Sequence, residues 1–210
     1  MRLSNKIVLA TLNRDKFDEF HSLFTAYPEV ELVEVESIIR NPSGLRTVEK
    51  YDSYLENAMA KARICNQASH YPCLADDSGL EVLALEGKLG VHSHRYAPPR
   101  AGVHQDQANN ELLLQEMKSK TDRSAKFVAT LVLLIEGIMI SATGVLEGTL
   151  LEHPRGSNGF GYDPLFLPKD SQKTLAEMTS SEKNRISHRA KALNELMTQI
   201  KANGIVFAKP

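Results

Sequence analysis

The segment AKFVATLVLLIEGIMISATG (125–144) constrains the fold more than any other part of the sequence. Two apolar runs meet at Glu136-Gly137, which predicts two strands joined by a tight turn. The same pair interrupts the apolar stretch, so the segment does not read as a membrane span. A hairpin brings antiparallel pairing into a chain whose other strands alternate with helices. We therefore expect a mixed sheet in an α/β or α+β protein.

Strand and helix patterns alternate along the rest of the chain. The predicted strands are KIVLAT (6–11), VELVEVES (30–37), the run leading into ADDSG (75–79) and LEVLAL (80–85). The predicted helices run from LNRD to near Pro28, over 53–70, over 106–117, and from 180 to a stop at Asn203-Gly204. Segments 41–52 and 156–164 read as loops. We expect a single domain over residues 1–210 with no separable linker.

Two of these helices have a defined apolar face. The residues on the face of the first are Phe17, Phe20, Leu23 and Phe24. Those on the face of the second are Leu55, Ala58, Met59, Ala62 and Cys65. Both sets follow the spacing of a helix with one buried side.

Composition excludes several classes of protein. The chain has 25 basic and 26 acidic residues, so it has no overall electrostatic attraction to nucleic acid or membranes. The N-terminal apolar run is too short for a signal peptide or a membrane span. Cys65 and Cys73 lack the partners of a zinc site, and we expect a protein of the reducing cytoplasm.

The pair Asp76-Asp77 in ADDSG is the first candidate for chemistry. Two carboxylates at a strand end can bind a hard cation and accept a proton from water. Side chains alternate along extended chain, so we expect the two acids to point to different sides, with one of them at most as the base. The alternative is an Asp-Ser-Gly turn, which the motif alone does not exclude.

The turn ATLNRDK brings Thr11, Asn13 and Lys16 to the start of a helix. Hydroxyl, amide, ammonium and backbone N–H groups together suit phosphate oxygens. The alternative is that Asn13 only caps the helix, and this interpretation is favoured for the turn taken alone.

The loop GFGYDP offers a stacking face in Phe160 and a fixed acceptor in Asp163, beside glycines that permit close approach of a ligand. We interpret the loop as a binding site for a flat heteroaromatic base. The alternative is that Phe160 only packs into the core.

The segment SSEKNRISHRAKALNEL (180–196) carries Lys183 and His188. On one continuous helix they would lie about 140° apart and could not converge. A break near Ile186 would let Ser187 cap a new helix, with His188 and Arg189 in its first turn. The inward residues of that helix would be Ala192, Leu193, Leu196, Met197 and Ile200. The alternative is a solvated basic helix face.

The motif HSHRY places His92 and His94 on one face of a predicted strand, a spacing that metal sites use. No third ligand is evident. Surface or packing histidines are therefore the favoured interpretation.

The order of these motifs resembles one family, the inosine triphosphate pyrophosphatases. The matching blocks are IVLATLNRDKFDEF, ENAMAKAR, ADDSGLEVLALEGKLGVHSHRYA, PRGSNGFGYDPLF, KTLAEM and EKNRISHRAKAL. The resemblance implies an elongated α/β fold, with a central mixed sheet and flanking helices that form two lobes around a nucleotide cleft. It also implies a homodimer and the magnesium-dependent hydrolysis of ITP, dITP and XTP to the monophosphate and pyrophosphate.

The resemblance also implies roles for particular residues. Asp77 matches the proton acceptor, and Glu49 and Asp77 match magnesium ligands. The residues that match substrate contacts are Thr11, Leu12, Asn13, Arg14, Asp15, Lys16, Ser78, Phe160, Gly161, Tyr162, Asp163, Lys183, His188 and Arg189.

The chain departs from the family pattern in two places. Leu12 and Asp15 replace glycines in the phosphate-binding turn, and HSHRYAPP replaces the usual YSARYAG. Either change in the turn could weaken or redirect substrate binding. Two alternatives therefore stay open: a weakly catalytic nucleotide sensor, and a related pyrophosphatase that acts on other modified nucleotides, including pyrimidines.

Overall fold

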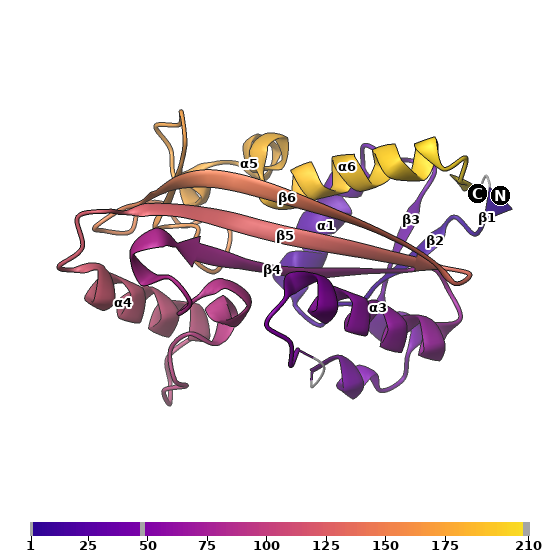
Figure 1. Cartoon of the computed structure of the whole chain (residues 1–210), viewed down its shortest axis with the longest axis horizontal. Helices are drawn as coiled ribbons and strands as arrows, with labels where there is room; N and C mark the ends of the chain where they lie inside the picture. The colour runs from indigo at the N-terminus through magenta and orange to yellow at the C-terminus, as the bar shows by residue number, and fades with distance from the viewer. Residues whose placement is uncertain (1, 47–48, 208–210) are drawn as a thin grey trace. The chain divides into compact units, whose positions relative to one another are not determined.

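The computed structural model describes residues 2–46 and 49–207 (Figure 1). The strands are β1 (Arg2–Leu3), β2 (Lys6–Leu9), β3 (Glu31–Glu34), β4 (Cys73–Val82), β5 (Ser124–Ile135), β6 (Ile138–Leu150), β7 (Phe166–Pro168) and β8 (Val206–Phe207). The α-helices are α1 (Arg14–Phe24), α2 (Val35–Ile38), α3 (Tyr54–Ser69), α4 (Gln105–Met117), α5 (Ser180–Ile186) and α6 (His188–Ala202). Short 3₁₀ helices are η1 (Pro42–Arg46), η2 (Leu83–Leu85), η3 (Gly90–Arg95) and η4 (Leu175–Glu177).

The main sheet is mixed, as predicted. Its strand order is β3-β2-β4-β5-β6-β7, and β1 pairs with β8 in a separate two-stranded sheet. Strand β2 is parallel to both β3 and β4, whereas β6 and β7 are antiparallel. The predicted hairpin is confirmed: Glu136 and Gly137 join β5 to β6, and their φ angles are 45° and 83°.

The chain divides into two compact units. The first unit contains Met1–Asp77, Ala129–Gly144 and Arg189–Pro210, and the second contains Ser78–Val128 and Val145–His188. Strands β4, β5 and β6 contribute residues to both units.

In the first unit, helices cover both faces of the sheet because the strand residues alternate. Ile7, Leu9 and Leu74 pack in one apolar cluster with residues of α1 and α6. Their neighbours Val8 and Cys73 pack in another cluster with residues of α3. Figure 1 shows α6 and α3 on opposite sides of the strands. The side to which a residue of β4 points therefore decides which helices it meets.

The second unit has its own core, in which Leu80 and Val82 of β4 pack with Leu113 and Met117 of α4. Gly79 allows a close approach here. A Cβ atom at this position would lie 2.0 Å from the carbonyl oxygen of Gly90, so any side chain would force the two backbones apart.

The predicted C-terminal helix is broken near Ile186, where the sequence leaves a break open as one alternative. Helix α5 ends at Ile186, and Ser187 has an extended backbone (φ −61°, ψ 153°) before α6 begins at His188. The predicted inward residues of α6 are all buried: Ala192, Leu193, Leu196, Met197 and Ile200. The helix stops at Ala202, and Gly204 has a positive φ of 66°.

Four local predictions are wrong. VELVEVES is a strand only as far as Glu34, because Val35–Ile38 forms the short helix α2. LEVLAL leaves the strand at Val82 and continues as η2. The predicted loop 41–52 contains η1, although residues 47 and 48 lie outside the described part of the chain. His92 and His94 lie in η3 and not on a strand.

Leu55 is the fifth exception. It is 40% exposed, although the sequence places it on the apolar face of α3. The buried side of α3 instead includes Asn57 and Lys61, two polar residues one helical turn apart. The buried face is therefore rotated away from Leu55 toward these two side chains.

Candidate active site

Strand β4 presents its two acids to opposite faces of the sheet. The segment ADDSG is continuous strand and not a turn, because β4 extends from Cys73 to Val82. Asp76 therefore faces α1 and α6, the side of Leu74, and Asp77 faces α3. This confirms the prediction that the neighbouring carboxylates point to different sides.

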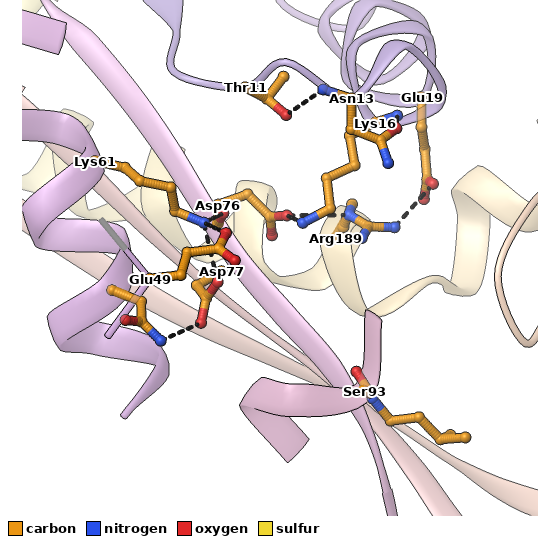
Figure 2. A network of polar contacts seen from close by, with 12 residues as sticks. Thr11, Asn13, Lys16, Glu19, Glu49, Lys61, Asp76, Asp77, Ser93 and Arg189 are labelled. Carbon is orange, nitrogen blue, oxygen red and sulfur yellow. Dashed lines mark hydrogen bonds and ion pairs between the residues drawn. The ribbon is translucent and has the colours of Figure 1, made fainter. Parts of the chain in front are cut away.

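Asp76 is paired with two cations (Figure 2). Lys16 Nζ lies 2.8 Å from its Oδ2, and Arg189 Nε lies 3.6 Å from the same oxygen. The Asp76 side chain is 1% exposed. Burial alone would raise the pKa of Asp76, but Lys16, Arg189 and Lys61 lower it below its ordinary value. Asp76 therefore stays ionised and holds two cations in place.

Glu19 of α1 is the second acidic partner of Arg189. Arg189 Nη1 donates to Glu19 Oε2 at 3.1 Å, and the two side chains are 5% and 7% exposed. Two carboxylates from different elements thus hold one guanidinium, which limits its rotation. Figure 2 shows Lys16, Glu19 and Arg189 together on one side of Asp76.

Asp77 has partners from α3. Lys61 Nζ donates to Asp77 Oδ1 at 2.9 Å, and Asn57 Nδ2 donates to Asp77 Oδ2 at 3.1 Å. Lys61 also donates to the backbone oxygen of Asp76 at 2.6 Å. Burial raises the pKa of Asp77 above its ordinary value, and Lys61 and Lys16 offset this only in part. A carboxylate with a raised pKa and fixed orientation is suited to accepting a proton.

Glu49 joins the same group through Lys61, whose Nζ donates to Glu49 Oε1 at 2.9 Å. Burial alone would lower the pKa of Lys61, but Asp77, Glu49 and Asp76 raise it. The ammonium group therefore stays charged between the two acids that the resemblance implies as magnesium ligands.

The side chains around Glu49 and Asp77 fit a magnesium ion that is shared with a substrate. Among the described residues, no group of three or more His, Cys, Asp or Glu side chains is placed to hold a metal. Magnesium is commonly held by one or two carboxylates together with substrate phosphates. The hard oxygen donors of Glu49 and Asp77 meet that requirement.

The turn ATLNRDK, which the sequence predicts to bind phosphate, is shaped mainly by its own hydrogen bonds. Asn13 is the N-cap of α1, and its Oδ1 accepts from Lys16 N at 2.9 Å. Thr11 Oγ1 accepts from Asn13 N at 3.2 Å, which shapes the turn from within. Lys16 is the residue of the turn that reaches an acid of β4. Asn13 therefore does cap the helix, as predicted for the turn taken alone.

Among the described residues, the contacts of the remaining turn residues, Leu12, Arg14 and Asp15, do not involve the acids of β4. Leu12 packs against the cluster that includes α3 residues. Arg14 is exposed and pairs with Asp18 and Glu34. Asp15 is exposed in the first turn of α1, where a negative charge interacts well with the helix dipole.

In the second unit, the loop GFGYDP forms a compact group around Asp163. Lys183 Nζ donates to Asp163 Oδ2 at 2.7 Å, and Phe160 N donates to the same oxygen at 3.0 Å. The Lys183 ammonium also lies 4.9 Å from the centre of the Phe160 ring. The structure thus brings together three residues that the sequence predicts around a base.

The other predicted contacts of the second unit have further partners. The His188 ring stacks on Phe127, with ring centres 4.8 Å apart and planes at 10°. Tyr162 is buried, and its hydroxyl donates to the carbonyl of Ser93 at 2.6 Å. Ser78 follows Asp77 directly in β4. His92 and His94 each lie 3.2 Å from Arg95 through a ring nitrogen, an arrangement that does not suggest a metal site.

The sequence profile of the Ham1 family matches residues 7–199. The chain belongs to the Ham1 family. A family relative from Christiangramia forsetii, named dITP/XTP pyrophosphatase, is 42% identical over 91% of this chain and 97% of its own length. One of the same name from Bordetella pertussis is 39% identical over 96% of this chain and 93% of its own. The Ham1 protein structure from Coxiella burnetii matches with a TM-score of 0.80 and 35% identity, covering 94% of this chain and 98% of that one. The predicted family resemblance is confirmed.

Three residues of the candidate site were missed in the sequence: Asn57, Lys61 and Glu19. The signal for the first two is their spacing, since Asn57 and Lys61 lie one turn apart beside the buried Ala58 and Ala62. Polar residues inside an otherwise apolar helix face indicate a buried polar partner. Glu19 gives no such signal, because it lies beside the apolar face of α1 like many solvated acids.

Proposed function

We propose that this protein hydrolyses the non-standard purine nucleoside triphosphates ITP, dITP and XTP to the nucleoside monophosphate and pyrophosphate. Membership of the Ham1 family and relatives named dITP/XTP pyrophosphatase support this activity. The observation that carries it is the arrangement around β4, where a buried carboxylate faces α3 and a cation-holding carboxylate faces α1 and α6.

Asp77 acts as the general base in this proposal. It accepts a proton from the water that attacks the α-phosphorus, and pyrophosphate leaves as the bond between the α- and β-phosphates breaks. Asn57 and Lys61 hold one oxygen of Asp77 each, which fixes the direction of the carboxylate. Its raised pKa makes it a better proton acceptor than an ordinary surface aspartate.

Lys16 supplies positive charge for the phosphate oxygens. Its side chain is 18% exposed, so it can meet a ligand while Asp76 fixes its position. Arg189 is more deeply buried and is held by Asp76 and Glu19 together. Asp76 is therefore assigned a role in orienting cations, and Asp77 the proton transfer.

Magnesium is the proposed metal, held by Glu49 and Asp77. When bound, it would neutralise charge on the phosphates and stabilise the pyrophosphate as a leaving group. The oxygen donors of the two acids support this choice of a hard cation.

The group around Asp163 is the proposed base-binding site. Phe160 offers a face for stacking, and Lys183 offers donors for a 6-oxo group. His188 and Arg189 are further proposed contacts. A 6-amino base would place a donor where an acceptor is required, which disfavours ATP. GTP keeps the 6-oxo group, so its exclusion has to depend on the 2-amino group.

A single domain over residues 1–210, a homodimer and a cytoplasmic location are also part of the proposal. Strands that contribute to both compact units support one domain, and the dimer rests on the family resemblance alone. Cys65 and Cys73 are free thiols 2.7 Å apart, which suits a reducing compartment. Within the described part of the chain, no helix combines the length and apolar character needed to cross a bilayer.

Pyrophosphate release from a panel of triphosphates tests the function. The panel is ITP, dITP, XTP, GTP, ATP and modified pyrimidine triphosphates. We expect ITP, dITP and XTP to be turned over, with kcat/KM for ATP lower by roughly 5- to 150-fold for each unpaired donor. Preferred turnover of a pyrimidine would indicate the related pyrophosphatase instead. ITP binding without turnover of any substrate would exclude the hydrolase.

A further inference from the structure

Two side chains of helix α4 form hydrogen bonds with the backbone of Gly161, the second glycine of the GFGYDP loop. Gly161 N donates to Asp106 Oδ2 at 2.7 Å, and Asn110 Nδ2 donates to Gly161 O at 2.9 Å. Asp106 and Asn110 are four residues apart on α4 and so lie on the same face of the helix. Neither residue is among those that the family resemblance implies as substrate contacts.

The two hydrogen bonds fix the conformation of Gly161 itself. One bond holds the peptide group before its Cα atom and the other holds the peptide group after it. Gly161 has a φ of 63°, and a Cβ atom there would meet nothing within 4 Å. Because a side chain at position 161 would have room, close packing does not explain why this residue is a glycine. The requirement is its left-handed backbone, which the contacts from α4 stabilise.

The conformation of Gly161 determines where Phe160 lies. Phe160 N is held by Asp163 on one side, and the peptide group between Phe160 and Gly161 is held by Asp106 on the other. Lys183, which contacts both Asp163 and the Phe160 ring, is placed against the same short segment. Replacing Asp106 would therefore free the peptide group between Phe160 and Gly161 and alter the position of the Phe160 ring.

The contacts are not required to hold α4 in place. His104 caps the helix by accepting from Asp106 N, and Leu113 and Met117 anchor it in the core of the second unit. Asn110 Oδ1 is buried and has no hydrogen-bond partner among the described residues. A buried amide oxygen without a hydrogen bond lowers stability. The presence of Asn110 at this position is therefore explained by the hydrogen bond that its Nδ2 donates to Gly161 O.

We infer that Asp106 and Asn110 are positioning residues for base recognition: they hold Gly161 in its left-handed conformation and so set the Phe160 ring against the purine. This inference rests on the proposed function, in which the loop binds the base. The two residues act through Gly161 and do not touch the substrate themselves.

Steady-state kinetics with ITP test the inference on five variants. Asp106→Ala is expected to raise KM for ITP about tenfold, with kcat changed less than about threefold, because one charge-assisted hydrogen bond is lost. Asp106→Asn keeps an oxygen acceptor and should recover most of the loss. Both variants remove the same charge from the start of α4, so their difference isolates the hydrogen bond.

Asn110→Leu separates positioning from stability. Leucine fills a similar volume and removes the unsatisfied Oδ1 atom, so we expect little change in melting temperature but a several-fold higher KM for ITP. Gln107→Ala is the matched control on the same helix, because the Gln107 side chain donates to Glu111 and not to the loop. The control should match the unmodified protein in KM and kcat.

A measurement without nucleotide tests the contact directly. Amide hydrogen exchange at Gly161, followed by NMR, should be protected in the unmodified protein and about tenfold faster in Asp106→Ala. Equal exchange in the two proteins would overturn the inference, whatever the kinetics.

Phe160→Ala distinguishes the two ways in which the kinetics could fail. If Phe160→Ala raises KM for ITP but Asp106→Ala and Asn110→Leu do not, the inference is overturned and the base-binding role of the loop stands. If Phe160→Ala also leaves KM unchanged, the proposed base-binding role is wrong and the inference falls with it.

Discussion

Lys61 and Asp77 form a buried ion pair, with Nζ and Oδ1 2.9 Å apart and both side chains 6% exposed. The lysine comes from α3 and the aspartate from β4, so the pair ties the helix to the strand. Because Lys61 also holds Glu49, one ammonium group keeps two acids close together. This relationship explains how a chain can place like charges side by side and still fold.

Replacing Asp77 by Asn should remove most of the activity. Asparagine keeps the shape and can still hydrogen-bond to Asn57 or Lys61, but it cannot accept a proton. We expect kcat for ITP to fall roughly 10²- to 10⁴-fold. Pyrophosphate release and circular dichroism measure rate and folding, with the exposed Asp122→Asn as control. An Asp77→Asn enzyme with unchanged kcat would exclude Asp77 as the base.

Replacing Asp76 by Asn should cost stability. Lys16 and Arg189 would face each other without their shared carboxylate, and breaking a buried ion pair in this way costs about 3–5 kcal/mol. Urea denaturation at pH 7 measures the free energy of unfolding. A loss below about 1 kcal/mol would show that the three groups are not coupled.

The same variant predicts a pH dependence. The pKa of Asp76 is lowered in the folded protein, so its contribution to stability is present above the ordinary aspartate pKa of about 4 and is lost as the pH falls below it. The stability difference between the unmodified protein and Asp76→Asn should therefore shrink between about pH 5 and pH 2. A difference that stays constant over this range would contradict the lowered pKa.

Replacing Glu19 by Gln should weaken substrate binding more than turnover. The glutamine side chain could still accept from Arg189, but one of the two charges that orient the guanidinium would be lost. We expect KM for ITP to rise about three- to tenfold with a smaller change in kcat. Glu195→Gln, an exposed change on α6, is the control. A change in kcat alone would argue against a role in substrate binding.

Replacing Asp15 by Asn should tighten substrate binding at low salt. Asp15 is exposed within the proposed phosphate turn, where its charge opposes a triphosphate. We expect KM for ITP to fall about two- to fivefold at about 0.05 M salt and to match the unmodified protein near 0.5 M, because salt screens exposed charges. A KM that equals that of the unmodified protein at both salt concentrations would show that Asp15 does not influence the substrate.

Periodicity predicted the parts of the fold that depend on a single element. The hairpin at Glu136-Gly137, the buried residues of α6 and the opposite directions of Asp76 and Asp77 all follow from local geometry. Each of these features needs no knowledge of a distant partner. The sequence raises the break at Ser187 only as a condition for Lys183 and His188 to converge, and it leaves a continuous helix open as the alternative.

The parts that the sequence could not predict depend on tertiary contacts. In the sequence, Lys61 does not differ from an exposed helical lysine, because its partners Asp77 and Glu49 are distant in the chain. Lys61 is buried and Leu55 is exposed, so the buried face of α3 differs from the predicted one. Asp106 and Asn110 depend likewise on a distant glycine, at 161. His92 and His94 match a strand pattern, but the backbone there forms a 3₁₀ turn with both rings against Arg95.

The uninterrupted path of β4 through ADDSG has a consequence for how this protein can change. Side chains of a strand alternate, so inserting or deleting one residue between Cys73 and Asp76 would exchange the faces of both acids at once. Asp77, the proposed proton acceptor, would then meet Lys16 and Arg189, and Asp76 would meet α3. The direction of each acid thus depends on whether its position in β4 is odd or even, so a change in length by one residue would reverse both.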